Sequence, residues 1–277
     1  MVNKLSLRQK FIVYGSLFSL ALFIIFPIYF MFIISLKRPA DIYRKPSLLP
    51  VNPTVVNYQQ LLSDLDFVTN IGNSLLIASA TTILSVLLAV FAAYSLVRLR
   101  YRGRRWVGRL ILFSYLTPAS LLFIPLAVII ARLRLANTLH GLVLVYLTFS
   151  TGLSTWLLMG YFRAIPPDLE EQAMVDGATR LGALFRVLLP VSAPGIVAVS
   201  VFTFTAAWNE LLLALIFITS PNLRTVPVAL NYLITGDTFR WGLIMAGAVA
   251  SAVPVMVLYY LAQRFVVQGL TAGSVKG

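Results

Sequence analysis

Acidic side chains are rare in this chain, and four of them fall in one short segment. Residues 165–190 read IPPDLEEQAMVDGATRLGALFRVLLP and contain Asp168, Glu170, Glu171 and Asp176, four of the nine acids in the chain. The acids follow two prolines at the start of a predicted helix, where they complement the helix dipole. We expect Asp168 to be the N-cap of this short amphipathic helix, and a second short helix to cover residues 181–187.

Other residue types that commonly carry catalysis are scarce. The chain has no cysteine and one histidine, His140, so a thiolate metal site is excluded and a histidine metal cluster lacks partners. The nucleotide-binding pattern G-x-x-x-x-G-K-[ST] is absent, as are paired carboxylates beside an activated nucleophile. We therefore predict no catalytic residues, no metal site and no cofactor bound by this chain.

The composition is that of an integral membrane protein. Of 277 residues, 59% are hydrophobic and 11% are charged, and the mean hydropathy is +0.89. A soluble domain carries about 25% charged residues, so this surface must face lipid. The net charge of +13 is interpreted as basic residues flanking membrane helices rather than as a nucleic-acid interface.

Six apolar segments are long enough to cross a bilayer, which takes about 20 helical residues. The first is longer than the apolar core of a cleaved signal, about 7–15 residues, so we interpret it as a retained helix. The proline-rich stretch after it predicts no helix until a short surface helix within residues 55–67. The predicted spans are 11–36, 71–97, 107–131, 139–161, 191–218 and 242–266.

The arginine-rich run RLRYRGRR, residues 98–105, sets the predicted orientation. Basic residues concentrate in cytoplasmic loops, so this connection is expected inside the cell. Six spans then place both termini and residues 165–190 in the cytoplasm. The run could instead bind anionic lipid, although flanking of the helices is the interpretation we favour.

A polar helix between two spans could lie on the membrane surface or bind a cytoplasmic partner. Helices that lie on lipid are rich in basic residues, whereas this one begins with acids. An apolar stripe suits insertion into a protein groove, and its members are Leu169, Ala173, either Val175 or Met174, and Ala178. We therefore interpret residues 165–190 as a docking element.

The spacing within this element resembles the cytoplasmic EAA loop of ABC importer permeases. Glu171, Gln172 and Ala173 take the places of E-A-A, Gly177 takes the glycine, and after nine residues Val187 to Pro190 take I-x-L-P. Gln172 and Val187 depart mildly from the pattern. Residues 207–215, AWNELLLAL, and the C-terminal GLTAGSVKG are similar to the carbohydrate-uptake branch and its maltose-type smaller permease subunit.

The resemblance implies a type I ABC importer permease fold: an all-α membrane protein of six transmembrane helices with short cytoplasmic coupling helices. It implies a multi-pass subunit of a prokaryotic inner or plasma membrane, paired as a heterodimer with a second homologous permease. Two cytoplasmic ATPase subunits would use ATP and Mg, and an extracytoplasmic sugar-binding protein would deliver a di- or oligosaccharide or a related glycoside. The implied ATPase-coupling residues are Glu170, Glu171, Ala173, Asp176, Gly177, Leu189 and Pro190.

The residues of the sugar route are less clearly indicated. Glu210 lies within a predicted span beside Trp208 and Asn209, and a carboxylate at that depth usually faces the bundle interior. These residues and Asn73 could line the route, with Trp208 as a stacking face. The alternative for Glu210 is a structural hydrogen bond to a neighbouring helix. In the predicted outer loop, the candidates for binding-protein contact are Asn222, Asn231, Tyr232 and Asp237.

Three regions are expected along the chain. Residues 1–69 would form the first helix and an extracytoplasmic loop, 70–267 the core permease domain with the coupling loop 163–190, and 268–277 a cytoplasmic tail.

Two other functional classes are alternatives to the importer. A secondary transporter would carry more charges at mid-membrane, and a membrane-embedded enzyme would need catalytic groups that are missing.

Overall fold

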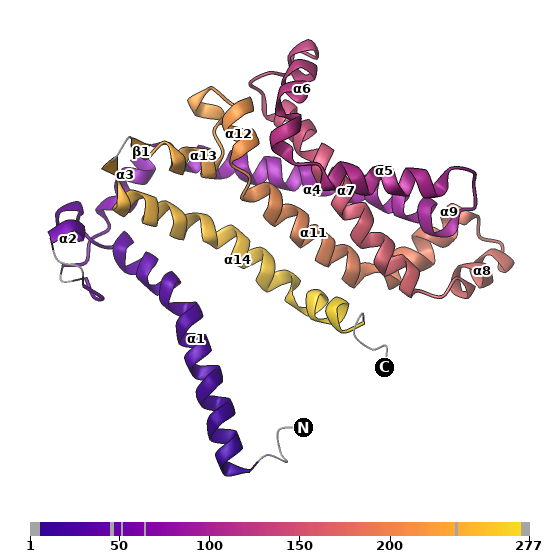
Figure 1. The fold of residues 1–277 in the computed structure, drawn as a ribbon, viewed down its shortest axis with the longest axis horizontal. Helices are drawn as coiled ribbons and strands as arrows, with labels where there is room; N and C mark the ends of the chain where they lie inside the picture. The colour runs from indigo at the N-terminus through magenta and orange to yellow at the C-terminus, as the bar shows by residue number, and fades with distance from the viewer. Residues whose placement is uncertain (1–5, 45–46, 51, 64, 236–237, 273–277) are drawn as a thin grey trace. The chain divides into compact units, whose positions relative to one another are not determined.

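The computed structural model describes residues 6–44, 47–50, 52–63, 65–235 and 238–272, and Figure 1 shows their backbone. The chain is helical apart from two short strands, β1 (Ile234–Thr235) and β2 (Thr238–Phe239), which pair antiparallel. It divides into two compact units, residues 1–67 with 230–252 and residues 68–229 with 253–277.

The first unit is organised by α1 and the polar stretch that follows it. Its helices are α1 (Leu7–Ser35), α2 (Pro39–Arg44), α3 (Val56–Ser63) and the start of α14 (Trp241–Ala272). The prediction of no helix before α3 is wrong for α2, because Pro39 takes the first helical position, where its missing N–H is tolerated. Asn57 ties α3 to the end of α1 by donating to the carbonyls of Ser35 and Lys37, both at 2.8 Å.

The second unit is a helix bundle with α7 at its centre. Figure 1 shows α7 beside α5 and α11, and both pack against it. Gly152 permits a close approach of α5 and α7, since a Cβ there would meet the Ile111 carbonyl at 3.0 Å. The helices of this unit are α4 (Phe67–Arg98), α5 (Arg104–Leu116), α6 (Ala119–Arg132), α7 (Leu139–Ala164), α8 (Asp168–Val175), α9 (Arg180–Ala183), η2 (Leu184–Leu188), α10 (Leu189–Val191), α11 (Ala193–Trp208), α12 (Leu212–Phe217), η3 (Pro221–Leu223), most of α13 (Val226–Asn231), and the end of α14.

Two apolar clusters and a chain of hydroxyls hold this unit together. One cluster surrounds Leu142 and Trp208, and the other surrounds Leu158 and Leu184. The hydroxyl of Ser154 lies 3.2 Å from that of Ser85 and 2.9 Å from that of Thr203. These bonds link α4, α7 and α11, and they satisfy polar groups that would otherwise be costly in hydrocarbon.

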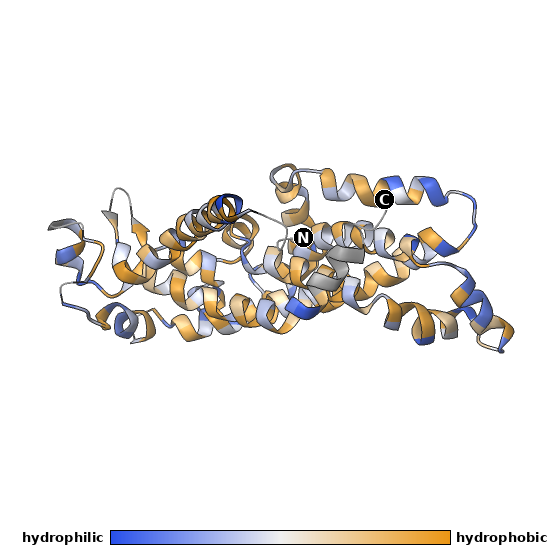
Figure 2. Cartoon of the chain, turned by 90° about the horizontal axis from the view of Figure 1, so that it is seen from below, coloured by the Kyte–Doolittle hydropathy of each residue, from blue (hydrophilic) through white to orange (hydrophobic). Residues whose placement is uncertain are grey.

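The helices confirm the predicted membrane protein. Among the described residues, α1, α4, α7 and residues 241–265 of α14 are each long and apolar enough to cross a membrane. Two bent pairs bring the number to six if each is one span: α5 with α6, bent by 100°, and residues 180–191 with α11, bent by 77°. Figure 2 shows hydrophobic residues along the helices and hydrophilic residues gathered at helix ends and connections.

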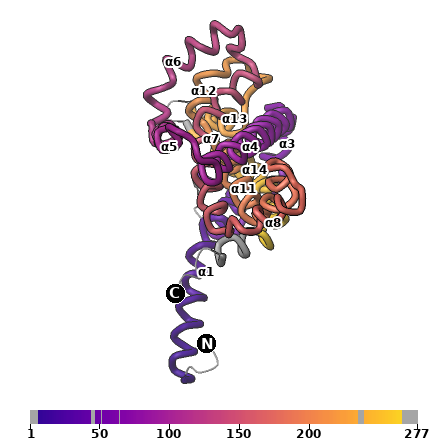
Figure 3. The backbone as a smooth tube through the Cα atoms, turned by 90° about the vertical axis from the view of Figure 1, so that its right-hand side faces the viewer, coloured from indigo at the N-terminus to yellow at the C-terminus, as the bar shows by residue number. Residues whose placement is uncertain are grey.

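Two predicted spans are interrupted rather than continuous. The span predicted at 107–131 breaks between α5 and α6, where Pro118 is the N-cap of α6 and lacks the N–H needed to continue α5. Figure 3 shows α6 turning away from α5. The span predicted at 191–218 breaks after Trp208 and resumes as α12 at Leu212.

Candidate functional site

The acidic segment, residues 165–190, forms two short helical stretches joined by a tight turn after α7. Its first helix, α8, has Pro167 as N-cap and Asp168 as its first residue, so the predicted N-cap at Asp168 is wrong by one position. At its C-terminus the N–H of Ala178 donates to the Ala173 carbonyl and that of Gly177 to the Met174 carbonyl, at 2.9 and 3.1 Å. This is a Schellman motif, and it requires the φ of +89° that Gly177 adopts.

An ion pair fastens α8 to the end of α4. The Arg98 Nε donates to the Glu170 carboxylate at 2.6 Å, and these side chains are 12% and 5% exposed. A second nitrogen of the same guanidinium donates to the Ile165 carbonyl at 2.8 Å. The Tyr94 hydroxyl, one turn earlier in α4, donates to the Arg180 carbonyl at 3.2 Å. Residues of α4 therefore hold both the start of α8 and the start of α9.

The second half of the segment is anchored by apolar packing. The predicted helix at 181–187 is one stretch of α9, η2 and α10, with Thr179 capping α9 by accepting from the Gly182 N–H. Leu184 and Leu188 are fully buried in a cluster with residues of α4, α7 and α11. Within η2 the Leu189 N–H donates to the Leu184 carbonyl five residues earlier, which makes this a π turn. Leu189 is half-buried and Pro190 is exposed.

Two of the predicted coupling residues, Glu171 and Asp176, lie on an open surface together with Gln172 and Val175. Glu171, Gln172, Val175 and Asp176 are exposed, and Val175 is 87% exposed. Together with Asp168 they line a shallow hollow. Ala173 is half-buried, and a Cβ added at Gly177 would meet no atom within 4 Å. A rigid, acidic surface with a projecting valine is suited to a complementary protein groove.

Glu210 lies at the break between α11 and α12. Its carboxylate accepts from the Tyr146 hydroxyl at 2.9 Å and from the backbone N–H groups of Leu213 and Ala214 at 3.0 and 3.1 Å. These two N–H groups belong to the first turn of α12, where helical partners are lacking. Glu210 therefore caps α12 and also opens on a hollow of about 380 Å³ bounded in part by Thr117 and Tyr146.

The other predicted route residues lie in different environments. Trp208 is 3% exposed and stacks on Phe204 with centroids 5.8 Å apart, so its face is covered. Asn209 is exposed and donates to the Thr205 carbonyl at 2.9 Å. Asn73 donates to the carbonyls of Asn222 and Arg224 at 3.0 and 3.1 Å, which holds the η3 loop against α4.

The four candidates for binding-protein contact do not belong to one compact unit. Asn222 lies in η3 of the second unit, whereas Asn231 and Tyr232 lie in the first unit, and all three are exposed. Asp237 lies outside the described residues. Within the described ranges, no group of three or more His, Cys, Asp or Glu side chains could hold a metal ion.

Three residues of these sites were not singled out by sequence reasoning. Arg98 was considered only as part of a basic run, and Tyr94 and Tyr146 not at all. Their partners lie 64 to 86 residues away along the chain. The sequence contained one signal for these contacts. Tyr94, Tyr146 and Glu210 lie in otherwise apolar segments, where a polar group needs a partner.

Comparison with known proteins identifies the family. Residues 85–272 match the family described as "Binding-protein-dependent transport system inner membrane component". The sulfoquinovosyl glycerol transport permease SmoH of Agrobacterium fabrum is 40% identical, over 91% of this chain and 89% of that protein. The trehalose/maltose transport permease MalG of Thermococcus litoralis is 35% identical over 98% of both.

A solved structure supports the same fold. A chain in the crystal structure of a bacterial ABC transporter that imports alginate aligns with a TM-score of 0.79 and 24% identity, covering 95% of this chain and 99% of that one.

A further sequence relative is the inner membrane ABC transporter permease YcjP of Escherichia coli, which is 36% identical over 95% of this chain and 96% of its own length. The chain therefore belongs to the family of binding-protein-dependent transport system inner membrane components, as a multi-pass permease subunit of an ABC importer and not its ATPase.

Proposed function

We propose that this permease carries a di- or oligosaccharide, or a related glycoside, through a path it shares with a second, homologous permease. The support is the set of relatives, which are described as permeases for sulfoquinovosyl glycerol, trehalose/maltose and diacetylchitobiose. Two cytoplasmic ATPase subunits supply energy from ATP and Mg, and an extracytoplasmic sugar-binding protein delivers the substrate. In this assembly both termini and the α8–α10 segment are cytoplasmic.

The single observation that carries the coupling role is the anchored, exposed α8. The ion pair to Arg98 and the buried leucines hold the segment rigid, while Glu171, Val175 and Asp176 remain on its surface. Closure of the ATPase subunits can favour one state of the membrane domain only through contacts that differ between states. A helix fixed to α4 passes such contacts directly into a membrane span. Glu170 then acts as a positioning residue, while Glu171, Ala173, Asp176 and Gly177 lie at the ATPase surface and Leu189 and Pro190 close the loop.

Glu210 and Asn209 are the residues we propose for the sugar route. Asn209 is exposed, and Glu210 opens on the hollow beside the α5–α6 break. Their amide and carboxylate groups can exchange hydrogen bonds with sugar hydroxyls. Trp208, directly before this turn, is buried and stacks on Phe204. Outside the membrane we assign Asn222, Asn231, Tyr232 and Asp237 to contact with the binding protein.

A pair of glycine substitutions tests the coupling surface. Gly177 and Gly103 have φ values of +89° and +87°, and neither has an atom within 4 Å of an added Cβ. Asparagine tolerates this backbone conformation better than most residues, so both variants should fold. We expect Gly177→Asn to reach the membrane at the normal level but to lose ATP-driven uptake and retention of the ATPase subunits.

The matched variant Gly103→Asn carries the same backbone strain outside the coupling segment. We expect it to keep most of the uptake in vesicles that contain the binding protein and ATP. Equal uptake by the two variants would contradict docking at Gly177. Uptake that persists in vesicles without ATP would instead favour a secondary transporter.

A further inference from the structure

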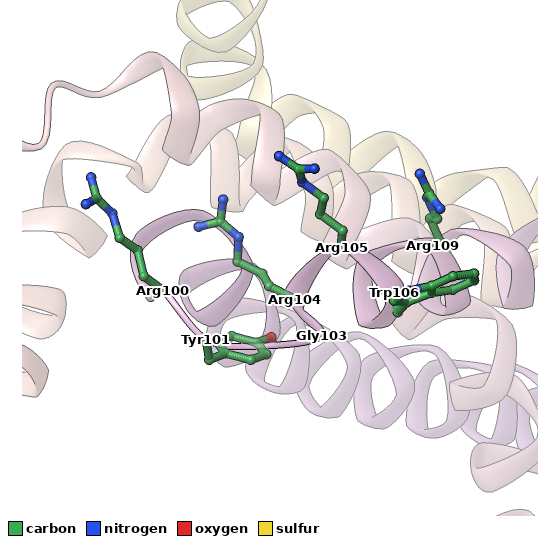
Figure 4. Close-up of a pocket in the computed structure, with 7 residues that line it drawn as sticks. All are labelled: Arg100, Tyr101, Gly103, Arg104, Arg105, Trp106 and Arg109. Atoms are coloured by element: carbon green, nitrogen blue, oxygen red, sulfur yellow. The ribbon is translucent and has the colours of Figure 1, made fainter.

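The connection from α4 to α5 presents a row of unneutralised arginines. In Figure 4 the side chains of Arg100, Arg104, Arg105 and Arg109 extend to the same side of the backbone. Arg104 donates to the Leu99 carbonyl at 3.0 Å, which fixes the turn. Within the described ranges no carboxylate pairs with these four, because the nearby Glu170 is paired with Arg98. They line a hollow of about 550 Å³ together with Tyr101, Gly103 and Trp106.

An aromatic side chain marks the same point as a boundary between polar and apolar surroundings. Trp106 is 67% exposed, and the Arg109 guanidinium lies 5.3 Å from its ring centroid. One and two turns further along α5, Leu110 and Phe113 are 64% and 69% exposed. Tryptophan is enriched where a helix passes from headgroups into hydrocarbon. The arginines therefore lie at headgroup level and the apolar stripe of α5 lies below them.

A second hollow adjoins the arginines and is apolar. It has a volume of about 400 Å³ and shares Arg104, Arg105 and Arg109 with the first. Arg163 of α7 adds a further guanidinium to its rim. The rest of its wall comes from α4, α5 and α7, through Leu96, Gly108, Ile111, Leu112, Trp156 and Met159. A basic rim above an apolar groove is complementary to an anionic headgroup that carries a hydrocarbon chain.

We propose that this surface, formed by Arg104, Arg105, Trp106, Arg109 and Arg163, binds one anionic phospholipid. The phosphate lies among the guanidiniums, with Arg105 and Arg109 as its main partners, and an acyl chain lies in the groove between α5 and α7. A free phosphate would leave the apolar groove unused, and an acidic peptide would not suit the apolar stripe that continues along α5. The lipid belongs to the cytoplasmic leaflet, and only that choice of leaflet rests on the proposed orientation.

Quenching of tryptophan fluorescence by brominated lipid tests the site in the assembled transporter. The complex is reconstituted in phosphatidylcholine discs, and brominated phosphatidylglycerol or brominated phosphatidylcholine is titrated in. Each arginine near an anionic surface strengthens binding by about five-fold, so Arg105→Gln/Arg109→Gln should lower the preference for phosphatidylglycerol by roughly twenty-fold. The control Arg132→Gln/Arg134→Gln removes two exposed arginines at the opposite end of α6 and should keep the preference.

Three further results decide the assignment. Trp106→Phe combined with Trp156→Phe, which removes both tryptophans that line the surface and its groove, should abolish most of the phosphatidylglycerol-specific quenching and so locate the lipid there. Inorganic phosphate at millimolar concentration should not displace the lipid; displacement would identify a free-anion site and overturn the proposal. Absence of lipid-specific quenching in the full complex would mean that a partner subunit covers the surface, and would also overturn it. None of these readouts depends on uptake, so they are independent of the Gly177 test.

Discussion

Two glutamates of the same compact unit are stabilised in opposite ways, Glu170 while buried and Glu210 while half-buried beside a hollow. Glu170 is neutralised by a cation, the Arg98 guanidinium at 2.6 Å. Glu210 is stabilised by neutral donors, the Tyr146 hydroxyl and two backbone N–H groups at 2.9 to 3.1 Å. One carboxylate has a single charged partner and the other has several uncharged ones.

The Glu170 ion pair joins two helices, α8 and α4, whereas the hydrogen bonds of Glu210 stabilise a turn within one predicted span. An ion pair of low exposure depends on both members, because loss of either leaves a charge without compensation. It therefore holds α8 to α4 firmly. Two of the three bonds to Glu210 lie within its own turn and stabilise the start of α12, and the third, from Tyr146, reaches α7. We expect the first arrangement to fail abruptly on substitution and the second to fail gradually.

The largest expected effect comes from reversing one charge of the ion pair. Arg98→Glu would place two carboxylates together, and disrupting a buried pair costs about 3–5 kcal/mol. The loop should detach from α4, so ATP-driven uptake should fall to background and limited proteolysis should cut within residues 165–180. Both properties are measured on membrane vesicles that contain the full complex.

The exchanged pair Arg98→Glu/Glu170→Arg provides the rescue. It restores opposite charges at the same positions, and we expect it to recover protease resistance and part of the uptake. Arg186→Glu, at an exposed arginine of the same loop, changes the net charge equally and should cause a much smaller loss. Failure of the exchange to recover resistance would show that charge pairing is not what holds the loop.

A smaller effect is expected at Glu210. Glu210→Ala removes the cap of α12 and the acceptor for Tyr146, which should lower the free energy of unfolding by about 2 kcal/mol. Glu210→Gln keeps one acceptor oxygen and should lose less. Thermal unfolding of the purified permease complex measures both changes.

Tyr146→Phe isolates the link between α7 and the turn. It removes one hydrogen bond, worth about 1 kcal/mol. Tyr115 lines the same hollow and its hydroxyl has no hydrogen bond among the described residues, so Tyr115→Phe should leave the stability unchanged.

For the Glu210 variants, equal losses of stability in Glu210→Ala and Glu210→Gln would indicate that the negative charge itself, rather than the capping bonds, is what matters.

The most local effect is expected for the tie between α4 and the η3 loop. Asn73→Ala removes two hydrogen bonds to backbone carbonyls and should speed hydrogen exchange in residues 219–225 without altering the coupling loop. Asn222→Ala is the control, because only the backbone carbonyl of Asn222 accepts from Asn73. Slower exchange, or a change in residues 165–190, would contradict a local role.

Much of the architecture could be predicted because apolar length is a local property of the sequence. The first, second, fourth and sixth predicted spans correspond to α1, α4, α7 and the membrane-length part of α14. The acids after two prolines and the apolar periodicity that follows predicted two short helices within residues 165–190, which correspond to α8 and to the stretch of α9, η2 and α10. Its glycine lies at a φ that favours glycine, which is consistent with the pattern.

The pairings could not be predicted, because they join residues that are far apart in the sequence. Val191 to Ile218 is apolar enough for one helix, and the sequence did not indicate that Glu210, which caps α12 locally, would also accept from Tyr146 across 64 residues. Likewise Arg98 belongs to a run of similar arginines, and nothing local distinguishes the one that meets Glu170. The helix α8 itself was thus easier to predict than its attachment to α4.

The π turn of η2 contains a spare residue between the docking helix and the membrane. A π turn holds one more residue than an α turn, and each residue of an α-helix advances the chain by about 100° around its axis. If the bond from Leu189 to the Leu184 carbonyl shifted to the α pattern, everything before it would rotate by roughly that angle relative to α11. Such a change of register would turn the segment before η2 without breaking its helical path. The buried Leu184 and Leu188 select the register seen here.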